Sequence, residues 1–166
     1  HASVWEDYLA AEEDRLSLDE TVRRYGIKTF VIDIRDSYDE PRHLAPRLTQ
    51  RTDWKTLYFD DDVGVYVHES PETAGYIAPL EFKYVTPHNP QKLVAALGRP
   101  ETRQAALDEL RRALELSGGS ANAHALAALA AGTLGNRQAA AAEISQALAR
   151  DPKNFLARQL AGGRGL

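Results

Sequence analysis

Three consecutive carboxylates, Asp60-Asp61-Asp62, form the densest group of chemically capable side chains in this sequence. Clustered carboxylates are the ligands that Ca²⁺ and Mg²⁺ prefer. The triplet lacks the twelve-residue spacing, the central glycine and the terminal Glu of a calcium-binding loop, and it joins two strand-like runs, where Asp favours a turn. We therefore predict a solvated hairpin turn at residues 60–62 and no metal ligands.

A second group of candidates follows strand-like runs. Asp33 and Asp36 come after an apolar run, where α/β enzymes often place functional residues, and His68 ends a later run. A small hydrolase or transferase using Asp33, Asp36 and His68 is one alternative. No Gly-rich phosphate loop, HExxH pair or nucleophile elbow accompanies them, and the chain has no Cys. We therefore expect no catalytic residues, no cofactor and a non-catalytic domain.

Length and charge narrow the class of protein. The chain has 166 residues, enough to bury a core, and a net charge of −4, unlike the basic domains that bind nucleic acid. No run reaches the roughly 20 apolar residues of a membrane helix. Residue 1 is His and the chain has no Met. We expect a globular piece of a larger or processed protein that does not itself span a membrane and has no nucleic-acid partner.

The composition changes at Pro87. Residues 1–86 carry 18 acidic and 10 basic side chains, and residues 87–166 carry 6 and 10. Twelve of the 13 aromatic residues precede Pro87, while alanine rises from 6 to 20. Aromatic and β-branched residues favour strands and alanine favours helices. We predict a mixed fold, α/β or α+β, with an α/β module over 1–86 and an all-α module over 87–166.

The first module reads as helix, strand, helix and hairpin (αβαββ). Ser17 and Glu20 have capping-box spacing before a helix that Gly26 ends. The apolar run 28–34 predicts a strand covered on both faces, which forms a parallel pair through a right-handed crossover. The remaining predicted elements are a short helix within 41–51, a hairpin over 54–59 and 63–67, and a short strand over 81–85.

The second module contains an internal repeat. Residues 105–116 align with 139–150 at an offset of 34 residues, which pairs Leu110 with Ile144 and Ala113 with Ala147. This period and the small residues at helix contacts resemble the tetratricopeptide repeat. Residues 121–154 match it well, 87–120 form a degenerate copy, and 155–166 are a cap or tail. Two repeats are few for a stable array, so we expect this module to dock on the first one.

The resemblance implies a peptide groove on the first helix of each repeat. Such a surface is typical of proteins that bind extended peptides, and a free-standing adaptor in the cytoplasm is therefore an alternative function. A generic pair of alanine-rich helical hairpins is the simpler interpretation of the same residues. The groove candidates are Gln91, Lys92, Asn122, Ala125, Leu129 and Thr133.

The first module also resembles a known context. The order of the Arg24-Tyr25-Gly26-Ile27 helix end, the 29–33 strand, Trp54 and the acidic turn resembles the C-terminal region of polytopic bacterial membrane proteins similar to dolichyl-phosphate-mannose-type glycosyltransferases. The resemblance implies an extracytoplasmic (periplasmic) accessory domain whose repeats contact a protein partner or the parent's membrane domain. It carries over no active-site residue, because the catalytic carboxylates of that family lie between early membrane helices.

Overall fold

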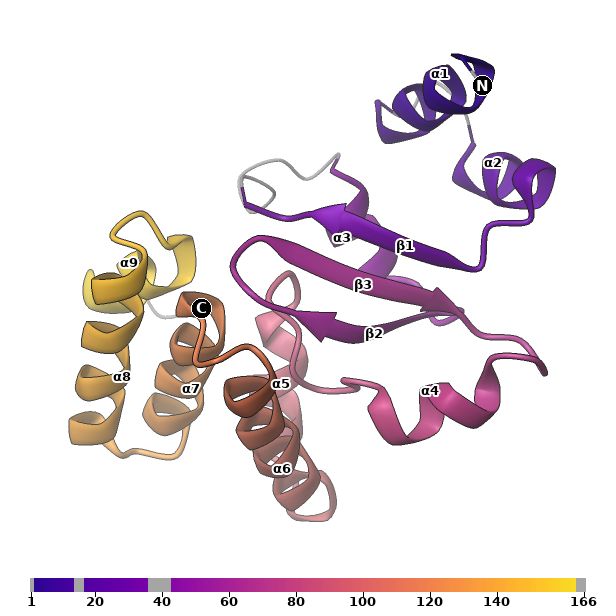
Figure 1. The fold of residues 1–166 in the computed structure, drawn as a ribbon. Helices are drawn as coiled ribbons and strands as arrows, with labels where there is room; N and C mark the ends of the chain where they lie inside the picture. The colour runs from indigo at the N-terminus through magenta and orange to yellow at the C-terminus, as the bar shows by residue number, and fades with distance from the viewer. Residues whose placement is uncertain (1, 14–16, 36–42, 164–166) are drawn as a thin grey trace.

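The computed structural model describes residues 2–13, 17–35 and 43–163 and has a mixed α+β fold (Figure 1). Three strands form one sheet: β1 (Thr29–Asp33), β2 (Trp54–Phe59) and β3 (Val63–His68). The helices are α1 (Ala2–Glu12), α2 (Leu18–Tyr25), α3 (Leu44–Thr49), α4 (Ala74–Leu80), α5 (Pro90–Leu97), α6 (Pro100–Leu116), α7 (Ala121–Thr133), α8 (Arg137–Arg150) and α9 (Phe155–Ala161). No helix in the described ranges is both long and apolar enough to cross a membrane.

The sheet order is β1-β3-β2, and both neighbouring pairs are antiparallel. The predicted hairpin forms, but the predicted parallel pair is wrong. β1 and β2 run in the same direction, but they are not neighbours. The β2–β3 hairpin places β3 between them, so each adjacent pair is antiparallel (Figure 1). The connection through α3 therefore joins two strands that are not neighbours.

β1 buries only one of its faces. Phe30 and Ile32 are buried, while Thr29, Val31 and Asp33 are exposed. This alternation is typical of an antiparallel sheet with one solvated face, so the prediction of a strand covered on both faces is wrong. On the buried face Trp54 packs on Phe30, with ring centroids 4.9 Å apart, which ties β1 to β2 across the central strand.

Residues 69–86 contain a helix instead of the predicted strand. Helix α4 occupies 74–80, and no strand forms over 81–85. The backbone N–H of Phe82 donates to the carbonyl of Thr56 at 2.8 Å. The carboxylate of Glu109 in α6 accepts from the N–H groups of Tyr84 and Val85. Because α6 supplies these acceptors, this segment satisfies its backbone without a second ladder.

Helix α2 ends as predicted but begins differently. Gly26 adopts a left-handed conformation with φ of 62° and closes the helix. The side chain of Ser17 makes no capping hydrogen bond, and Glu20 pairs with Arg24 one turn later instead of reaching back. The predicted capping box is therefore absent, and Arg24 engages the Glu20 carboxylate that would have completed it.

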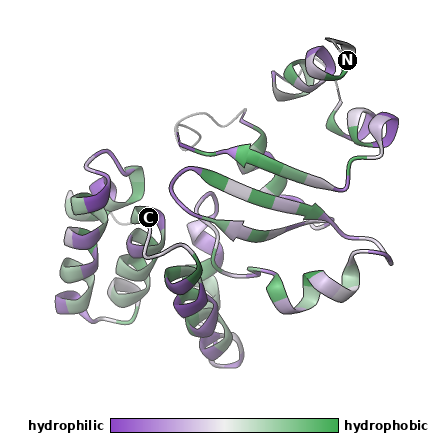
Figure 2. Cartoon of the chain, viewed as in Figure 1, coloured by the Kyte–Doolittle hydropathy of each residue, from purple (hydrophilic) through white to green (hydrophobic). Residues whose placement is uncertain are grey.

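The C-terminal helices pack on the sheet and share its core, as expected. Helix α7 contacts α5, α6, α8 and α9 and is buried along most of its length. Leu93, Leu97 and Leu126 belong to the same hydrophobic cluster as Phe59 and Tyr66 of the sheet. Figure 2 shows hydrophobic residues on both the sheet and these helices, and the cluster shows that one continuous core runs through both parts of the chain.

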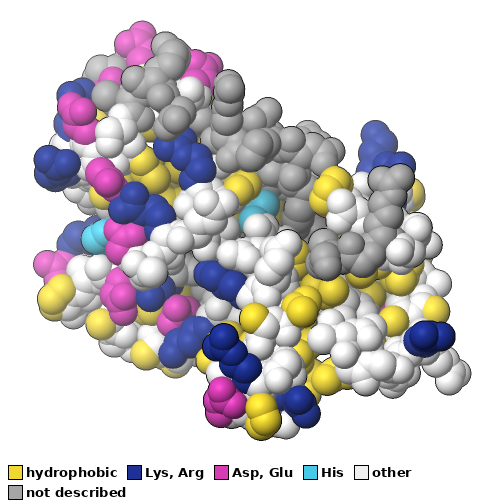
Figure 3. Space-filling view, turned by 180° about the vertical axis from the view of Figure 1, so that it is seen from behind, with side chains coloured by type: hydrophobic (Ala, Val, Ile, Leu, Met, Phe, Trp, Pro, Cys, Tyr) yellow, Lys and Arg dark blue, Asp and Glu magenta, His cyan; other side chains and the backbone are white. Residues whose placement is uncertain are grey.

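Charge is distributed unevenly over the surface. In Figure 3, which views the molecule from behind, acidic and basic side chains are interspersed over the side that holds the sheet and the first helices. The side formed by the C-terminal helices shows few charged side chains in that view. Charged side chains also gather at the junction of the hairpin turn with the last two helices, α8 and α9.

Candidate functional site

The turn of the β2–β3 hairpin reaches the beginning of α7. The carboxylate of Asp61 accepts hydrogen bonds from the backbone N–H groups of Ala121 and Asn122, both at 2.8 Å. These N–H groups have no partner within their own helix, and a negative charge beside them is favoured by the helix dipole. The hydroxyl of Ser120 accepts from the N–H of Ala123, so the end of α7 is capped from two directions.

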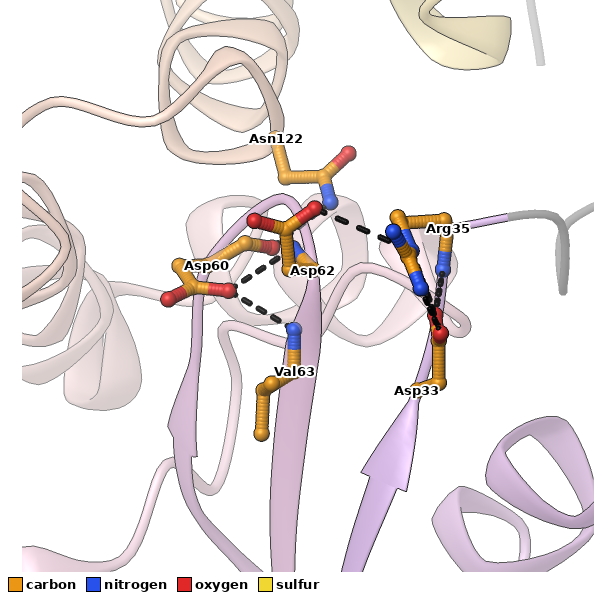
Figure 4. Close-up of polar contacts among 6 residues, drawn as sticks. All are labelled: Asp33, Arg35, Asp60, Asp62, Val63 and Asn122. Carbon is orange, nitrogen blue, oxygen red and sulfur yellow. Dashed lines mark hydrogen bonds and ion pairs between the residues drawn. The ribbon is translucent and has the colours of Figure 1, made fainter.

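Asp60 builds the turn that holds Asp61 in place. Its carboxylate accepts from the N–H groups of Asp62 at 2.8 Å and Val63 at 2.7 Å (Figure 4). The hydroxyl of Tyr58 donates to the same carboxylate at 2.8 Å. Burial, reinforced by Asp60, raises the pKa of the Tyr58 phenol to about 12. Two of the three acidic residues are therefore structural acceptors, in agreement with a hairpin turn.

Two buried asparagines continue this connection to α9. The side-chain amide of Asn122 donates to the carbonyl of Asp60 at 2.8 Å, and its oxygen accepts from the amide of Asn154 at 2.8 Å. The oxygen of Asn154 accepts from the N–H of Ala157 and so caps α9. Both asparagines are 4% exposed with both side-chain ends bonded, so the turn, α7 and α9 form one rigid unit.

A cleft of about 780 Å³ opens beside this unit, and we call it the turn cleft. It lies between the hairpin turn, the end of β1 and the α8–α9 junction. Its lining includes four basic, three acidic and three other residues: Arg35, Arg150, Lys153, Arg158, Asp61, Asp62, Asp151, Asn122, Asn154 and Phe155.

The cations of the turn cleft differ in how they are neutralised. Arg35 pairs with Asp33, and its hydrogen bonds lower the pKa of that carboxyl to about 2. Arg35 also lies 3.9 Å from the exposed carboxylate of Asp62 (Figure 4). Lys153 and Arg158, by contrast, have no carboxylate within 4 Å in the described part of the chain. The C-terminal wall of the cleft therefore carries positive charge available to an anionic group.

The side chains of the turn cleft can contact a ligand through charge and hydrogen bonding. Within the described residues, no group of three or more His, Asp or Glu side chains is arranged to hold a metal ion. The carboxylate of Asp61 is occupied by two N–H donors, and Asp62 is 70% exposed. Guanidinium and ammonium groups bind carboxylates and phosphates, so the turn cleft is suited to an anionic ligand.

The structure does not bring the predicted groove residues together on an open surface. Asn122, Ala125 and Leu129 are buried. The ammonium of Lys92 donates to the carbonyl of Thr49 at 2.9 Å, and burial lowers its pKa. Gln91 on α5 and Thr133 at the end of α7 are exposed. Helix α7 is covered because α5, α6, α8 and α9 all pack against it, and of the six candidates only Asn122 lines the turn cleft.

The residues of the enzyme alternative also lie apart. Asp33 is paired in register with Val63, and Thr29 with Val67, so His68 lies at the opposite end of the sheet from Asp33. His68 packs edge-on against Trp54. Asp36 lies outside the described residues. Asp33 and His68 therefore share no site.

The basic residues of the turn cleft were missed by the sequence analysis. Arg150, Lys153 and Arg158 surround the Asp151-Pro152 turn, which the repeat pattern marks only as a helix terminator. The signal that points to them is the charge of residues 87–166, which carry four more basic than acidic side chains.

Comparisons of the chain with protein-family models, with curated proteins and with solved structures find no match.

Proposed function

We propose that this chain is a non-catalytic interaction domain in which the sheet and its helices hold a tetratricopeptide-like helical array, and that the turn cleft binds an acidic segment of a protein partner. One observation carries the proposal: Lys153 and Arg158 line a cleft of about 780 Å³ without carboxylate partners in the described residues.

Three properties of the turn cleft support an acidic peptide. Its rigid floor of Asp61, Asn122 and Asn154 is fully hydrogen-bonded, so binding costs little ordering of the protein. Its cations stand on separate segments, Arg150 at the end of α8, Lys153 before α9 and Arg158 within α9, which suits a chain with several carboxylates. Phe155, 38% exposed beside them, offers apolar surface to a neighbouring side chain of the peptide.

The parent protein we propose is a membrane-embedded glycosyltransferase-like protein, with this domain on its extracytoplasmic side. The support is the order of helix end, strand, tryptophan and acidic turn in residues 24–61. The acidic segment would then belong to a partner or to the parent's own membrane domain. Hydrophobic segments of about 20 residues encoded upstream of residue 1 would support this context. Their absence would favour a free-standing peptide-binding adaptor.

Binding of a fluorescein-labelled Glu-rich peptide, followed by anisotropy, tests the proposal. We expect saturable binding that weakens with salt, because exposed charges are screened. Replacing either cation, Lys153→Glu or Arg158→Glu, should weaken binding about tenfold. The matched control Arg137→Glu makes the same charge change at the opposite end of α8 and should leave affinity unchanged. Equal loss in all three variants, or no binding at low salt, would contradict the proposal.

A further inference from the structure

The two outer strands of the sheet differ in how their free edges are covered. The outer edge of β2 meets α4 and α6, and its Thr56 carbonyl accepts from the N–H of Phe82. β1 is the opposite edge strand, uppermost in Figure 1, and among the described residues its ladder partner is β3 alone. An uncovered edge exposes a row of N–H and C=O groups that can pair with another chain.

The register identifies which groups of β1 are unpaired. The carbonyl of Lys28 accepts from the N–H of His68, and the N–H of Ile34 donates to the carbonyl of Asp62. In an antiparallel pair, residues that alternate with such hydrogen-bonded positions turn their N–H and C=O groups away. These residues are Thr29, Val31 and Asp33, whose backbone groups have no partner in the described chain.

Edge strands are commonly protected by Pro, Lys or a bulge, and residues 29–32 of β1 have none of these. Figure 2 shows the strand as largely hydrophobic, and Val31 is 69% exposed. A largely apolar groove of about 550 Å³ lies beside it, formed by α1, α2 and β1. Val31 and Trp5, which is 62% exposed, both line this groove. The free edge and the exposed apolar surface therefore coincide.

We propose that two copies of this chain pair through β1, antiparallel and centred on Val31. In this register Val31 lies opposite its own symmetry mate, and Thr29 lies opposite Asp33 of the second copy. The three outward-facing residues of each strand then become hydrogen-bonded pairs. On the buried face Phe30 lies beside Ile32 of the second copy, which extends the apolar layer.

The strand pairs along its whole length in this register. A two-fold axis at Asp33 would instead place two carboxylates opposite each other, which is unfavourable. The axis at Val31 pairs the whole strand and opposes no like charges. It also brings a second apolar strand beside Val31 and the groove. This register pairs every outward-facing residue of β1 with a residue of the same strand, and on that complementarity we base the assignment of a second copy to the edge.

Proline at the centre of the strand tests the pairing. The N–H of Val31 has no partner in the part of one copy that the structure describes, so Val31→Pro should preserve the β1–β3 ladder, as Pro does in edge strands. It removes the two symmetry-related central hydrogen bonds of the dimer, and we expect dimerisation to weaken by about thirtyfold or more. The control Val31→Thr keeps the N–H and the β-branched shape and should retain the dimer.

Sedimentation velocity of the full chain, from micromolar to millimolar concentration, gives the dimer constant. Hydrogen exchange locates the interface: the N–H groups of Thr29, Val31 and Asp33 should become protected as concentration rises. Circular dichroism verifies that Val31→Pro is folded, and Val31→Lys serves if it is not. A chain that stays monomeric throughout, or a dimer that Val31→Pro and Val31→Lys leave unchanged while the three amides exchange freely, overturns the proposal.

Discussion

At the scale of single residues, Asp61 does more than its place in a surface turn suggests. It is one of three adjacent carboxylates, yet it alone reaches N–H groups of α7, 60 and 61 residues further along the chain. The triplet could be recognised from the sequence as a turn, because Asp favours turns. The helix that Asp61 caps could not be recognised from the sequence, because no local sequence signal specifies a contact between residues so far apart in the chain.

Replacing Asp61 by Ala should destabilise the protein by about 1–2 kcal/mol, the usual cost of losing a helix N-cap. The exposed neighbour provides a matched control: Asp62→Ala should stay within about 0.5 kcal/mol of wild type. Urea unfolding followed by circular dichroism measures both. Equal effects of the two substitutions would show that the contact between Asp61 and α7 contributes nothing to stability.

His88 makes stability depend on pH. It is largely buried, its Nδ1 lies 3.5 Å from the hydroxyl of Tyr66, and burial, with His43 nearby, lowers its pKa to about 4. The unfolded chain binds a proton at His88 near pH 6.5, whereas the folded chain does so only near pH 4. Folding therefore favours the neutral imidazole of His88. The free energy of unfolding decreases as the pH falls from about 6.5 to 4.

We expect this loss to reach about 2–3 kcal/mol at pH 4, from the difference between the two pKa values. The measurement is urea unfolding of wild type and His88→Gln at intervals between pH 7 and pH 4. The substituted side chain does not titrate, so the stability difference between the two proteins should change across this interval. A difference that is constant with pH would refute the assignment.

At the scale of elements, local signals predicted most of the structure. The run 28–34, the hairpin around residues 60–62 and the helices of the alanine-rich half all form where the sequence indicates them. Apart from the absent capping box and the unpredicted helix α4, the errors concern long-range pairing. Whether β3 or β2 lies beside β1 depends on how the hairpin folds back, and residues 81–85 fail to form a strand because α6 supplies their partners.

Arg112 of α6 shows how a residue distant in sequence fixes the end of another helix, α4. From α6 its guanidinium donates to the carbonyls of Pro79, Leu80 and Glu81 at the end of α4, and it lies 4.2 Å from the ring centroid of Phe82. Helix ends leave such carbonyls without partners. The guanidinium therefore closes α4 and anchors it to α6.

Arg112→Ala should cost about 2–3 kcal/mol, because several charge-assisted hydrogen bonds and a ring contact are lost. Arg112→Lys keeps the charge but not the planar fork and should fall between Ala and wild type. The adjacent Arg111→Ala removes only an exposed pair with Asp108 and should change stability by less than about 0.5 kcal/mol. Chemical denaturation of the three variants ranks them, and a loss in Arg111→Ala equal to that in Arg112→Ala would contradict this role.

At the scale of the whole molecule, two compositionally different parts share one core and meet at the turn cleft. The change of composition at Pro87 could be read directly from the sequence. The turn cleft could not be predicted from the sequence. Its cations come from positions 35 and 150–158, and they converge only when the hairpin turn docks on α7. The first part supplies Asp61 of the floor, and the second part supplies Asn122, Asn154 and the cations Arg150, Lys153 and Arg158, which makes the site a product of docking.

In our proposal this docked arrangement binds acidic peptide at the turn cleft. A titration of the isotope-labelled chain with a Glu-rich peptide, followed by amide and arginine side-chain NMR signals, tests it. We expect shifts concentrated at Arg35, at residues 150–158 and at the turn 60–62, and their loss in the double variant Lys153→Glu/Arg158→Glu. Shifts centred instead on Gln91 and Thr133, or none in the turn cleft, would contradict it.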